Sequence, residues 1–337
     1  MKIDGSFGHN ALVSASSIVE RAQELESLGF DGLLSVETSH EPFFPLVLAA
    51  HHTRNIELRT SIAVALARSP MNLANAGHDL NALSQGRFTL GLGSQIRAHI
   101  TRRFSMPWHG PAKQMRELIE ATQAIWDCWY DGQPLNYTGD FYHHTLMTPE
   151  FTPKNIEHGR PKIVMAAVGP LMITTAAAVA DGIVIHPFCT ETYLRDVILP
   201  RVETELAKRD KSLADFEIQY PVFMAIGETE EQLNKAKEAV RYRIGFYAST
   251  PAYKSVLDVH GWGDLQPILR LMTKEGKWDE LPSQISDDIL ETFAVVGEPA
   301  KAATLVKERF GDVVDRVTLD ATGSPNVLAE QMAAIHA

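Results

Sequence analysis

Residues 56–92 read IELRTSIAVALARSPMNLANAGHDLNALSQGRFTLGL, and this stretch decides the fold. Residues 56–65 are rich in β-forming side chains and predict a buried strand. Residues 70–84 carry apolar side chains at helical spacing, and residues 88–92 are again short, apolar and strand-like. A helix that joins two buried strands through short links predicts a right-handed crossover between parallel strands.

The same strand–helix unit recurs along the chain and gives eight units in total. Two units lie before residue 56, in which strands at 2–7 and 31–36 precede helices at 13–28 and 42–52. A predicted helix at 111–129 completes the unit that begins with the strand at 88–92. Four follow residue 160, with strands at 162–167, 182–186, 216–225 and 314–319. Their predicted helices span 171–180, 191–209, 229–247 and 325–335. An open doubly wound sheet is the alternative, but eight units fit a closed (β/α)8 TIM barrel better.

Two segments interrupt this rhythm, at about residues 131–160 and 249–298. Both are rich in Gly, Pro and aromatic residues, which indicates loops and short helices. We therefore expect a single domain over residues 1–337, with both insertions at the C-terminal mouth of the barrel, where barrel enzymes vary and bind their substrates. The fold thus predicts an enzyme that acts on a small molecule.

Composition excludes several classes of partner and site. The formal net charge is −11, and such an acidic chain lacks the general basic surface that nucleic acids or anionic membranes require. Cys128 and Cys189 form no Cys-x-x-Cys pair, which fits a reducing cytoplasm. The sequence shows neither a signal peptide nor an apolar segment long enough to cross a bilayer.

Polar residues that directly follow predicted strands are the first candidates for chemistry. His40, in ETSHEPF after the second strand, stands where a barrel enzyme places a catalytic group, and its imidazole could donate or accept a proton. A helix-capping or loop histidine is an equally good interpretation. His51 and His52 are adjacent on a helix and cannot easily share one ion, and no metal-binding motif is present, so we expect no metal.

Three further loops could hold an anionic ligand. GLGSQ (residues 91–95) ends the fourth strand but lacks the third glycine of a dinucleotide fingerprint, and tight packing at the rim explains it as well. After the fifth strand, AAVGPLM leads into a helix whose amino terminus could bind phosphate, together with His186 after the sixth strand. Arg97, Arg102 and Arg103 form a basic cluster that could hold an anion or be a solvated surface.

Together these segments resemble the bacterial luciferase-like superfamily, and within it the oxidoreductases that use the deazaflavin coenzyme F420. The resemblance covers nearly the whole chain and is strongest in residues 59–99, in PKIVMAAVGPLM with VADGIVIHP, and in AVVGEPAKAATLVKERFGDVVDRVTL. SQGRFTLGLG after a long helix is a specific signal of the superfamily. The choice between deazaflavin and flavin is less specific.

The resemblance implies positions for the cofactor. It places a non-prolyl cis peptide under the ring, at Ser61–Ile62, and His40 beside the ring. Gly93, Ser94 and Gln95 would run along the cofactor. Its phosphate would lie on the loops after the fifth and sixth strands, which carry the residues Ala166, Ala167, Val168, Gly169 and His186.

Two departures from the family pattern bear on the substrate. Ser39 stands where many relatives have Asp, and Ile96 lies nearest to the position of a Glu found in sugar-phosphate dehydrogenases of the family. No basic residues that would hold a sugar phosphate are evident. The Phe, Trp and Met residues of the insertions instead favour an apolar or aromatic substrate, whose identity the sequence does not give.

The resemblance thus implies an oxidoreductase that transfers a hydride between F420 and a small organic molecule, working as a homodimer paired through its second and third helices. An alternative is an FMN-dependent monooxygenase with a separate reductase. There are two further alternatives: a barrel that binds flavin without catalysis, and a hydrolase without a redox cofactor. The sequence lacks a set of metal-ligating residues, which weighs against the hydrolase.

Overall fold

Eight short strands form a closed parallel barrel in the computed structural model, which describes residues 1–8, 14–319 and 325–336. Each strand pairs in parallel with two others, and pairing of the first with the last closes the ring. This confirms the predicted TIM barrel and excludes an open sheet. In ring order the strands are β1 (Lys2–Ser6), β2 (Gly32–Ser35), β3 (Glu57–Thr60), β5 (Phe88–Gly93), β8 (Lys162–Ala167), β9 (Gly182–Ile185), β10 (Glu217–Tyr220) and β13 (Arg316–Thr318).

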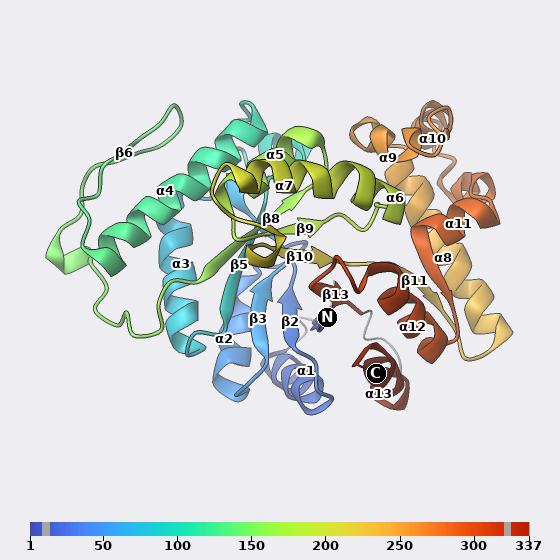
Figure 1. The fold of residues 1–337 in the computed structure, drawn as a ribbon, viewed down its shortest axis with the longest axis horizontal. Coiled ribbons are helices and arrows are strands. Elements are labelled where there is room, and N and C mark those ends of the chain that lie inside the picture. The colour runs from blue at the N-terminus through green and yellow to red at the C-terminus, as the bar shows by residue number, and fades with distance from the viewer. Residues whose placement is uncertain (9–13, 320–324, 337) are drawn as a thin grey trace.

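Helices surround the barrel and bury one apolar face each against it (Figure 1). Ser14 and Ser69 cap the first and third of them with side-chain hydrogen bonds, which is why these helices begin where they do. The helices are α1 (Ala15–Ser27), α2 (Phe43–His52), α3 (Pro70–Leu83), α4 (Pro111–Asp131), α5 (Pro170–Val179), α6 (Glu191–Tyr193) continued by η4 (Leu194–Ile198) and α7 (Leu199–Ala207), α12 (Pro299–Phe310) and α13 (Pro325–His336).

The seventh unit departs from the expected pattern. The predicted strand 216–225 is divided at Pro221, which has no N–H to continue the ladder, so β10 stays in the barrel and β11 (Phe223–Ile226) leaves it. Outside the barrel β11 pairs with β12 (Ala294–Gly297). Helix α8 (Glu230–Ala248) packs on this pair, and α12 returns the chain to β13.

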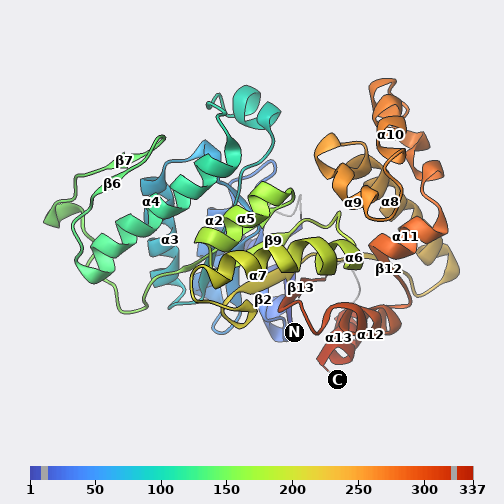
Figure 2. The same ribbon diagram turned by 45° about the horizontal axis from the view of Figure 1, so that its top comes forward.

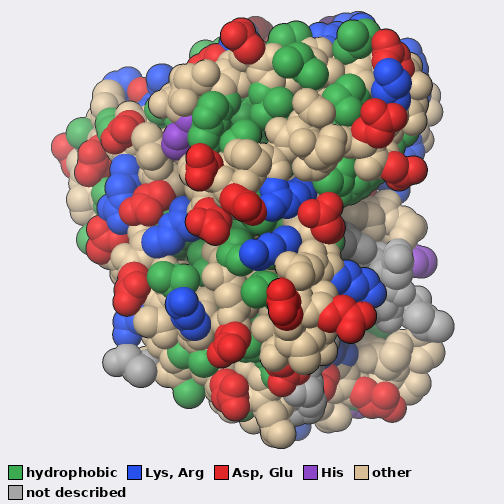
Figure 3. All heavy atoms as spheres, turned by 90° about the vertical axis from the view of Figure 1, so that its right-hand side faces the viewer, with side chains coloured by type: hydrophobic (Ala, Val, Ile, Leu, Met, Phe, Trp, Pro, Cys, Tyr) green, Lys and Arg blue, Asp and Glu red, His purple; other side chains and the backbone are tan. Residues whose placement is uncertain are grey.

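The segment between α8 and β12 forms a separate lobe beside the mouth (Figure 2). Hydrophobic side chains gather on the upper part of the face that Figure 3 shows. Two apolar residues of the lobe, Ile268 and Leu271, are 49% and 56% exposed. The lobe contains η6 (Pro251–Tyr253), α9 (Lys254–Asp258), α10 (Leu265–Lys274), η7 (Trp278–Gln284) and α11 (Asp287–Phe293).

The segment 131–160 does not lie over the mouth, which corrects the expectation for it. Its hairpin of β6 (Tyr137–Thr138) and β7 (His143–His144) runs along the outer side of α4 (Figures 1 and 2). The Glu117 carboxylate of α4 accepts a hydrogen bond of 2.8 Å from the Phe141 N–H. Arg160 pairs with Asp127 and Asp131 at the end of α4. These ion pairs and the hydrogen bond hold the segment away from the mouth.

Buried charges fill the floor of the barrel, at the amino ends of its strands. Arg316 and Asp4 are completely buried and pair with each other, and Arg316 also pairs with Glu57. Arg59, 1% exposed, pairs with Glu217. Desolvation raises the pKa of Asp4 to about 6 in spite of the nearby arginines. Since this end of a barrel does not carry catalysis, we interpret the network as structural.

None of the helices in the described part of the chain combines the length and the hydropathy needed to cross a membrane.

Candidate active site at the barrel mouth

A bulge interrupts the third barrel strand where it reaches the mouth. The strand ends at Thr60 and resumes as β4 (Ala63–Val64), and the peptide bond between Ser61 and Ile62 is cis. The structure thus confirms the predicted position of this bond. The loop after β2 holds the bulge: the Ser61 N–H donates to the Ser35 carbonyl at 2.8 Å, and the Glu37 N–H donates to the Ile62 carbonyl at 3.3 Å.

The bulge brings Ile62 against two other predicted residues. A Cβ at position 93 would lie 2.8 Å from Ile62 Cδ1 and 3.5 Å from the Ala166 Cβ, so only glycine fits at Gly93 without displacing Ile62. Ile62, Gly93 and Ala166 therefore meet at the carboxyl ends of three neighbouring strands. Together they form a cradle at the mouth, in which the Ile62 side chain occupies the space that a side chain at residue 93 would need.

Glu37 is a site residue that the sequence interpretation missed. Its buried carboxylate accepts hydrogen bonds from the Val64 N–H and from Arg68 Nη1, both at 2.7 Å. Arg68 also donates to Glu41 at 2.8 Å. This arrangement ties the loop after β2 to the far side of the bulge. The available signal was an acidic residue after one strand and an arginine after the next, both in positions that face the mouth.

His40 lies in the loop that Glu37 and Glu41 anchor. Its ring is exposed at the mouth, where a bound molecule could reach it. The Phe43 N–H donates to Glu41 at 2.7 Å and starts α2 directly after the loop. Arg103, from η2 (His99–Arg103), donates to the Thr38 carbonyl and covers the loop from the other side. The loop is thus held at both ends while His40 itself stays accessible.

The loop after β8 presents an open helix terminus. Gly169 precedes Pro170, the first residue of α5, and no side chain caps this helix. A Cβ at Gly169 would find no atom within 4 Å, and Val168 and Gly169 are both only half-buried. Uncapped N–H groups at the positive end of a helix bind anions. The predicted phosphate position is therefore physically suitable.

His186 follows the neighbouring strand, since Ala167 of β8 pairs with Ile185 of β9. Its Nδ1 accepts a hydrogen bond of 3.0 Å from the Phe188 N–H, so the ring proton lies on Nε2, 3.4 Å from the Tyr253 hydroxyl. The ring stacks on Tyr253 at 4.8 Å and meets the edge of Tyr247 at 4.6 Å. Burial, together with the charge of Arg243, lowers its pKa to about 4. His186 is thus a neutral hydrogen-bond donor at physiological pH.

Ser94 and Gln95 form a local turn beyond Gly93. Gln95 adopts a left-handed conformation with φ of 58°. The Ser94 hydroxyl donates to the Gln95 carbonyl at 3.1 Å, and the Gln95 side chain accepts from the Ile96 N–H at 3.0 Å. Both residues are half-buried at the mouth, but their hydrogen bonds are with each other and with Ile96. Their contact with a cofactor stays a prediction.

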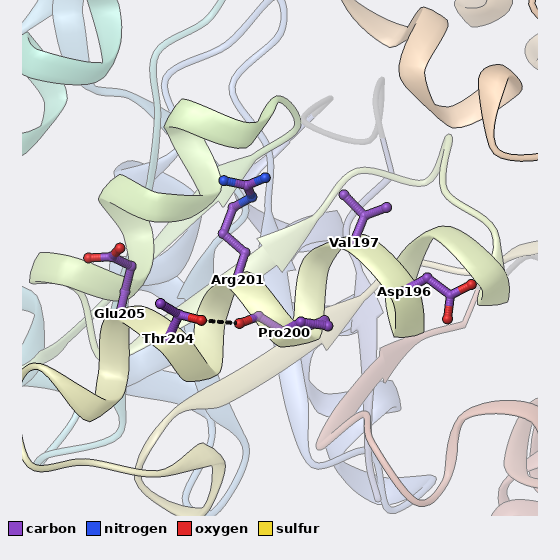
Figure 4. Close-up of a pocket in the computed structure, with 6 residues that line it drawn as sticks. All are labelled: Asp196, Val197, Pro200, Arg201, Thr204 and Glu205. Atoms are coloured by element: carbon purple, nitrogen blue, oxygen red, sulfur yellow. Dashed lines mark hydrogen bonds between the residues drawn. The ribbon is translucent and has the colours of Figure 1, made fainter.

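The described residues offer neither a ligand pocket on the outer surface of η4 and α7 nor a metal site. A hollow of about 420 Å³ is lined by six residues of η4 and α7 alone, on the outer surface of the barrel (Figure 4). A single helical stretch cannot enclose a small molecule as a pocket between elements does. Within residues 1–8, 14–319 and 325–336, no three His, Cys, Asp or Glu side chains gather in a way that could hold a metal.

Comparison with known proteins places this geometry in a family. A model of the luciferase-like monooxygenases matches residues 3–316. An uncharacterized protein of Mycobacterium tuberculosis is 45% identical over 317 residues, which cover 94% of this chain and 92% of that one. The 5,10-methylenetetrahydromethanopterin reductase of Archaeoglobus fulgidus is 25% identical over 84% of this chain and 79% of that one.

A solved structure has the same fold along nearly the whole chain. It is the coenzyme F420 dependent tetrahydromethanopterin reductase of Methanopyrus kandleri, with a TM-score of 0.78 and 20% identity over 98% of this chain and 96% of that one. The family model and the 45% identical relative both span almost the full length of this sequence, as does the barrel itself. The chain therefore belongs to the luciferase-like monooxygenase family.

Proposed function

We propose that the protein is an oxidoreductase that transfers a hydride between the deazaflavin coenzyme F420 and a small apolar or aromatic organic substrate. The observation that carries this proposal is the cradle of Ile62, Gly93 and Ala166 at the cis bulge, with the accessible His40 in the adjoining loop. A flat ring needs such a surface without side-chain obstruction. An anionic tail needs donors, which the open amino terminus of α5 supplies.

Two relatives favour the deazaflavin over the flavin. The methylenetetrahydromethanopterin reductase of Archaeoglobus fulgidus matches most of the chain, and the Methanopyrus kandleri structure that shares the fold is described as F420 dependent. Both are reductases. These likenesses support a reductase or dehydrogenase type of chemistry for this chain.

The residues of the mouth have distinct roles in this proposal. The bound deazaflavin supplies the hydride chemistry, and the protein binds, orients and shields it from water. Ser61 and Ile62 would support the ring, and Gly93, Ser94 and Gln95 would border it. Ala166, Ala167, Val168 and Gly169 would leave room for the phosphate, and His186 Nε2 would donate a hydrogen bond without adding charge. His40 would donate a proton to the substrate or stabilise charge that develops at the ring.

Aromatic side chains at the lobe support an apolar or aromatic substrate. Tyr247 and Tyr253 flank His186, and Phe188 lies 5.8 Å from Tyr253. Phe188 in turn stacks on Phe293 at 4.5 Å. Phe188 and Phe293 are fully buried and pack behind the half-buried rings of Tyr247 and Tyr253, which lie beside His186. A substrate bound next to these two tyrosines would contact aromatic side chains.

The second candidate is an FMN-dependent monooxygenase that receives reduced flavin from a separate reductase. The family description itself favours it, because it names monooxygenases. The same cradle and helix terminus would suit the flavin ring and its phosphate.

We also propose a homodimer that pairs through α2 and α3. Phe44 and Val47 lie one turn apart on the outer face of α2 and are 72% and 39% exposed, and Leu83 at the end of α3 is 57% exposed. Exposed apolar side chains on neighbouring helices are suited to pairing. Both cysteine thiols are free, which suits the cytoplasm that we propose as the compartment.

Turnover separates the two candidate activities. The protein is mixed anaerobically with reduced F420 and a panel of small aromatic or aliphatic aldehydes, ketones and enones, and reoxidation of F420 is followed by absorbance. The proposal expects reoxidation that depends on one class of substrate and is lost in His40→Ala. Turnover only with reduced FMN and oxygen would instead establish the monooxygenase.

A further inference from the structure

A second cavity lies between α8 and the helices α12 and α13. It has a volume of about 590 Å³ and is bounded by α8, β11, α13 and the first residue of α12. Its floor is apolar and includes Met224, Ile226 and Val240. Ligand cavities in proteins have volumes of about 300–1,000 Å³. The groove can therefore take a small organic molecule.

The charges of the groove are unevenly distributed along α8. Lys235 and Arg243 both line it, eight residues and hence about 12 Å apart on the helix. Neither forms an ion pair with any residue that the structure describes. Glu228 also lines the groove, just before α8 begins, where its N–H is bonded to Gln232. The end at Arg243 keeps its positive charge.

Arg243 is held in place although no acidic side chain among the described residues pairs with it. Its guanidinium lies over the Phe223 ring, 4.7 Å from the ring centre. A cation stacked on an aromatic face keeps its hydrogen-bond donors free at the edges of the plane. The groove thus combines an apolar floor with a fixed cation that forms no ion pair within the described part of the chain, in a protein of net charge −11.

We infer that this groove binds an amphipathic carboxylate, with the anionic head on Arg243 and the apolar tail over Met224, Ile226 and Val240. The guanidinium can hold a carboxylate through two parallel hydrogen bonds. The tail then replaces water on the apolar floor. Glu228 at the opposite end disfavours the reverse orientation.

The groove is distinct from the proposed cofactor position but adjoins the mouth. None of the residues of the bulge or of the loop after β8 lines it. A row of aromatic contacts connects the two places: Phe223 stacks with Tyr247 at 6.2 Å, and Tyr247 contacts His186 at 4.6 Å. The groove therefore goes beyond the proposed oxidoreductase site, and its occupancy does not require a cofactor.

The test uses octanoate as the probe, with octanol and octylammonium as charge controls, and measures binding to the full chain by calorimetry. Octanoate is expected to bind more tightly than either control. Arg243→Gln should weaken octanoate binding by about tenfold or more, since a charge-assisted pair contributes on this scale. Arg243→Lys should restore part of the affinity. Ala239→Trp, which places a large ring in the groove, should abolish binding.

Lys274→Gln is the matched control, because it removes one exposed positive charge from α10, outside the groove. It should leave the octanoate affinity unchanged, and thermal unfolding verifies that each variant is folded. Equal binding of octanoate and octanol, or octanoate binding that survives both Arg243→Gln and Ala239→Trp in folded protein, would overturn the inference. Absence of octanoate binding would overturn it as well. None of these results would affect the cofactor proposal, because cofactor binding is measured in a separate titration.

Discussion

Gly93 and Ile62 approach each other so closely at the barrel mouth that a Cβ on residue 93 would stand 2.8 Å from the Ile62 side chain. Ile62 follows the cis peptide bond, and Gly93 ends the neighbouring strand β5. The shape of the proposed ring-binding surface thus depends on one missing side chain. This dependence can be tested by adding a methyl group at residue 93.

Gly93→Ala should displace Ile62 and weaken cofactor binding. We expect a loss of about 1–3 kcal/mol in the free energy of unfolding, as for other overpacked sites, together with a lower affinity for F420. Urea unfolding and fluorescence titration measure the two effects. Gly169→Ala is the matched control for stability, because its Cβ meets nothing within 4 Å. It should unfold like the wild type and still bind the cofactor less tightly, because its methyl group would crowd the phosphate. If both variants bound F420 as tightly as the wild type, the cradle would not be part of the cofactor site.

His40→Ala should reduce kcat without affecting the fold. General acid–base groups contribute about 10²–10⁴-fold in rate, and exposed side chains change stability by no more than about 0.5 kcal/mol. Steady-state kinetics, cofactor titration and thermal unfolding together check this. Turnover that persists at the wild-type rate, with the cofactor bound, would show that His40 is not catalytic.

Glu37→Ala should destabilise the loop that carries His40. It removes the acceptor of the buried Val64 N–H and of Arg68, and we expect a loss of about 1–3 kcal/mol in unfolding free energy. Glu37→Gln keeps an acceptor and should lose less. Glu41→Ala, which removes the partly exposed partner of Arg68 and the acceptor of the Phe43 N–H, serves as the comparison. If Glu37→Ala were no less stable than Glu41→Ala, the anchoring role of Glu37 would be wrong.

Arg316→Leu should be among the most damaging changes in the barrel floor. It leaves the fully buried Asp4 without its partner, which costs about 3–5 kcal/mol for a buried pair. Arg316→Leu combined with Asp4→Leu should recover part of the loss. Lys2→Ala removes an exposed cation that also pairs with Glu57 and should cost less than about 1 kcal/mol. Chemical denaturation measures the unfolding free energy of the three variants. A small loss of unfolding free energy in Arg316→Leu would mean that the buried ion pairs do not stabilise the floor of the barrel.

His186 should make stability depend on pH in the acidic range. Its folded pKa of about 4 is below the ordinary value of 6.5, so between these values the unfolded chain binds more protons and stability rises with pH. The contribution is complete above pH 6.5 and is lost as the pH falls toward 4. Asp4, with its pKa raised to about 6, acts in the opposite direction over part of this range.

The difference between wild type and His186→Asn isolates the histidine, because the Asn side chain can still accept the hydrogen bond from Phe188. This difference in unfolding free energy should change between pH 4 and 6.5 and be constant from pH 6.5 to 8. A difference that is constant throughout would mean that His186 is protonated equally in both states.

The barrel could be predicted from the sequence because each unit is local. The segment 56–92 contains a strand, a helix and a strand with short links, and parallel pairing follows from these links. The split of the seventh strand at Pro221 was missed, although a proline in a strand is a known interruption. As a consequence, α8 was assigned to the barrel, where α12 takes its place.

Placements that depend on long-range contacts could not be predicted. The hairpin of residues 137–144 lies on α4 because Glu117 and Asp127 bond to it and to Arg160, and no local pattern shows which helix such a segment will contact. Glu37 was missed for the same reason, since its partners Val64 and Arg68 are about 30 residues away. The position of the cis bond was available only through the family resemblance.

Cofactor titration tests the central claim most directly. The purified protein is titrated with F420 and, separately, with FMN, and quenching of fluorescence is followed. The account predicts micromolar or tighter binding of F420 and much weaker binding of FMN. Preference for FMN would contradict the deazaflavin assignment and favour the monooxygenase, and binding of neither would leave the barrel without its proposed cofactor.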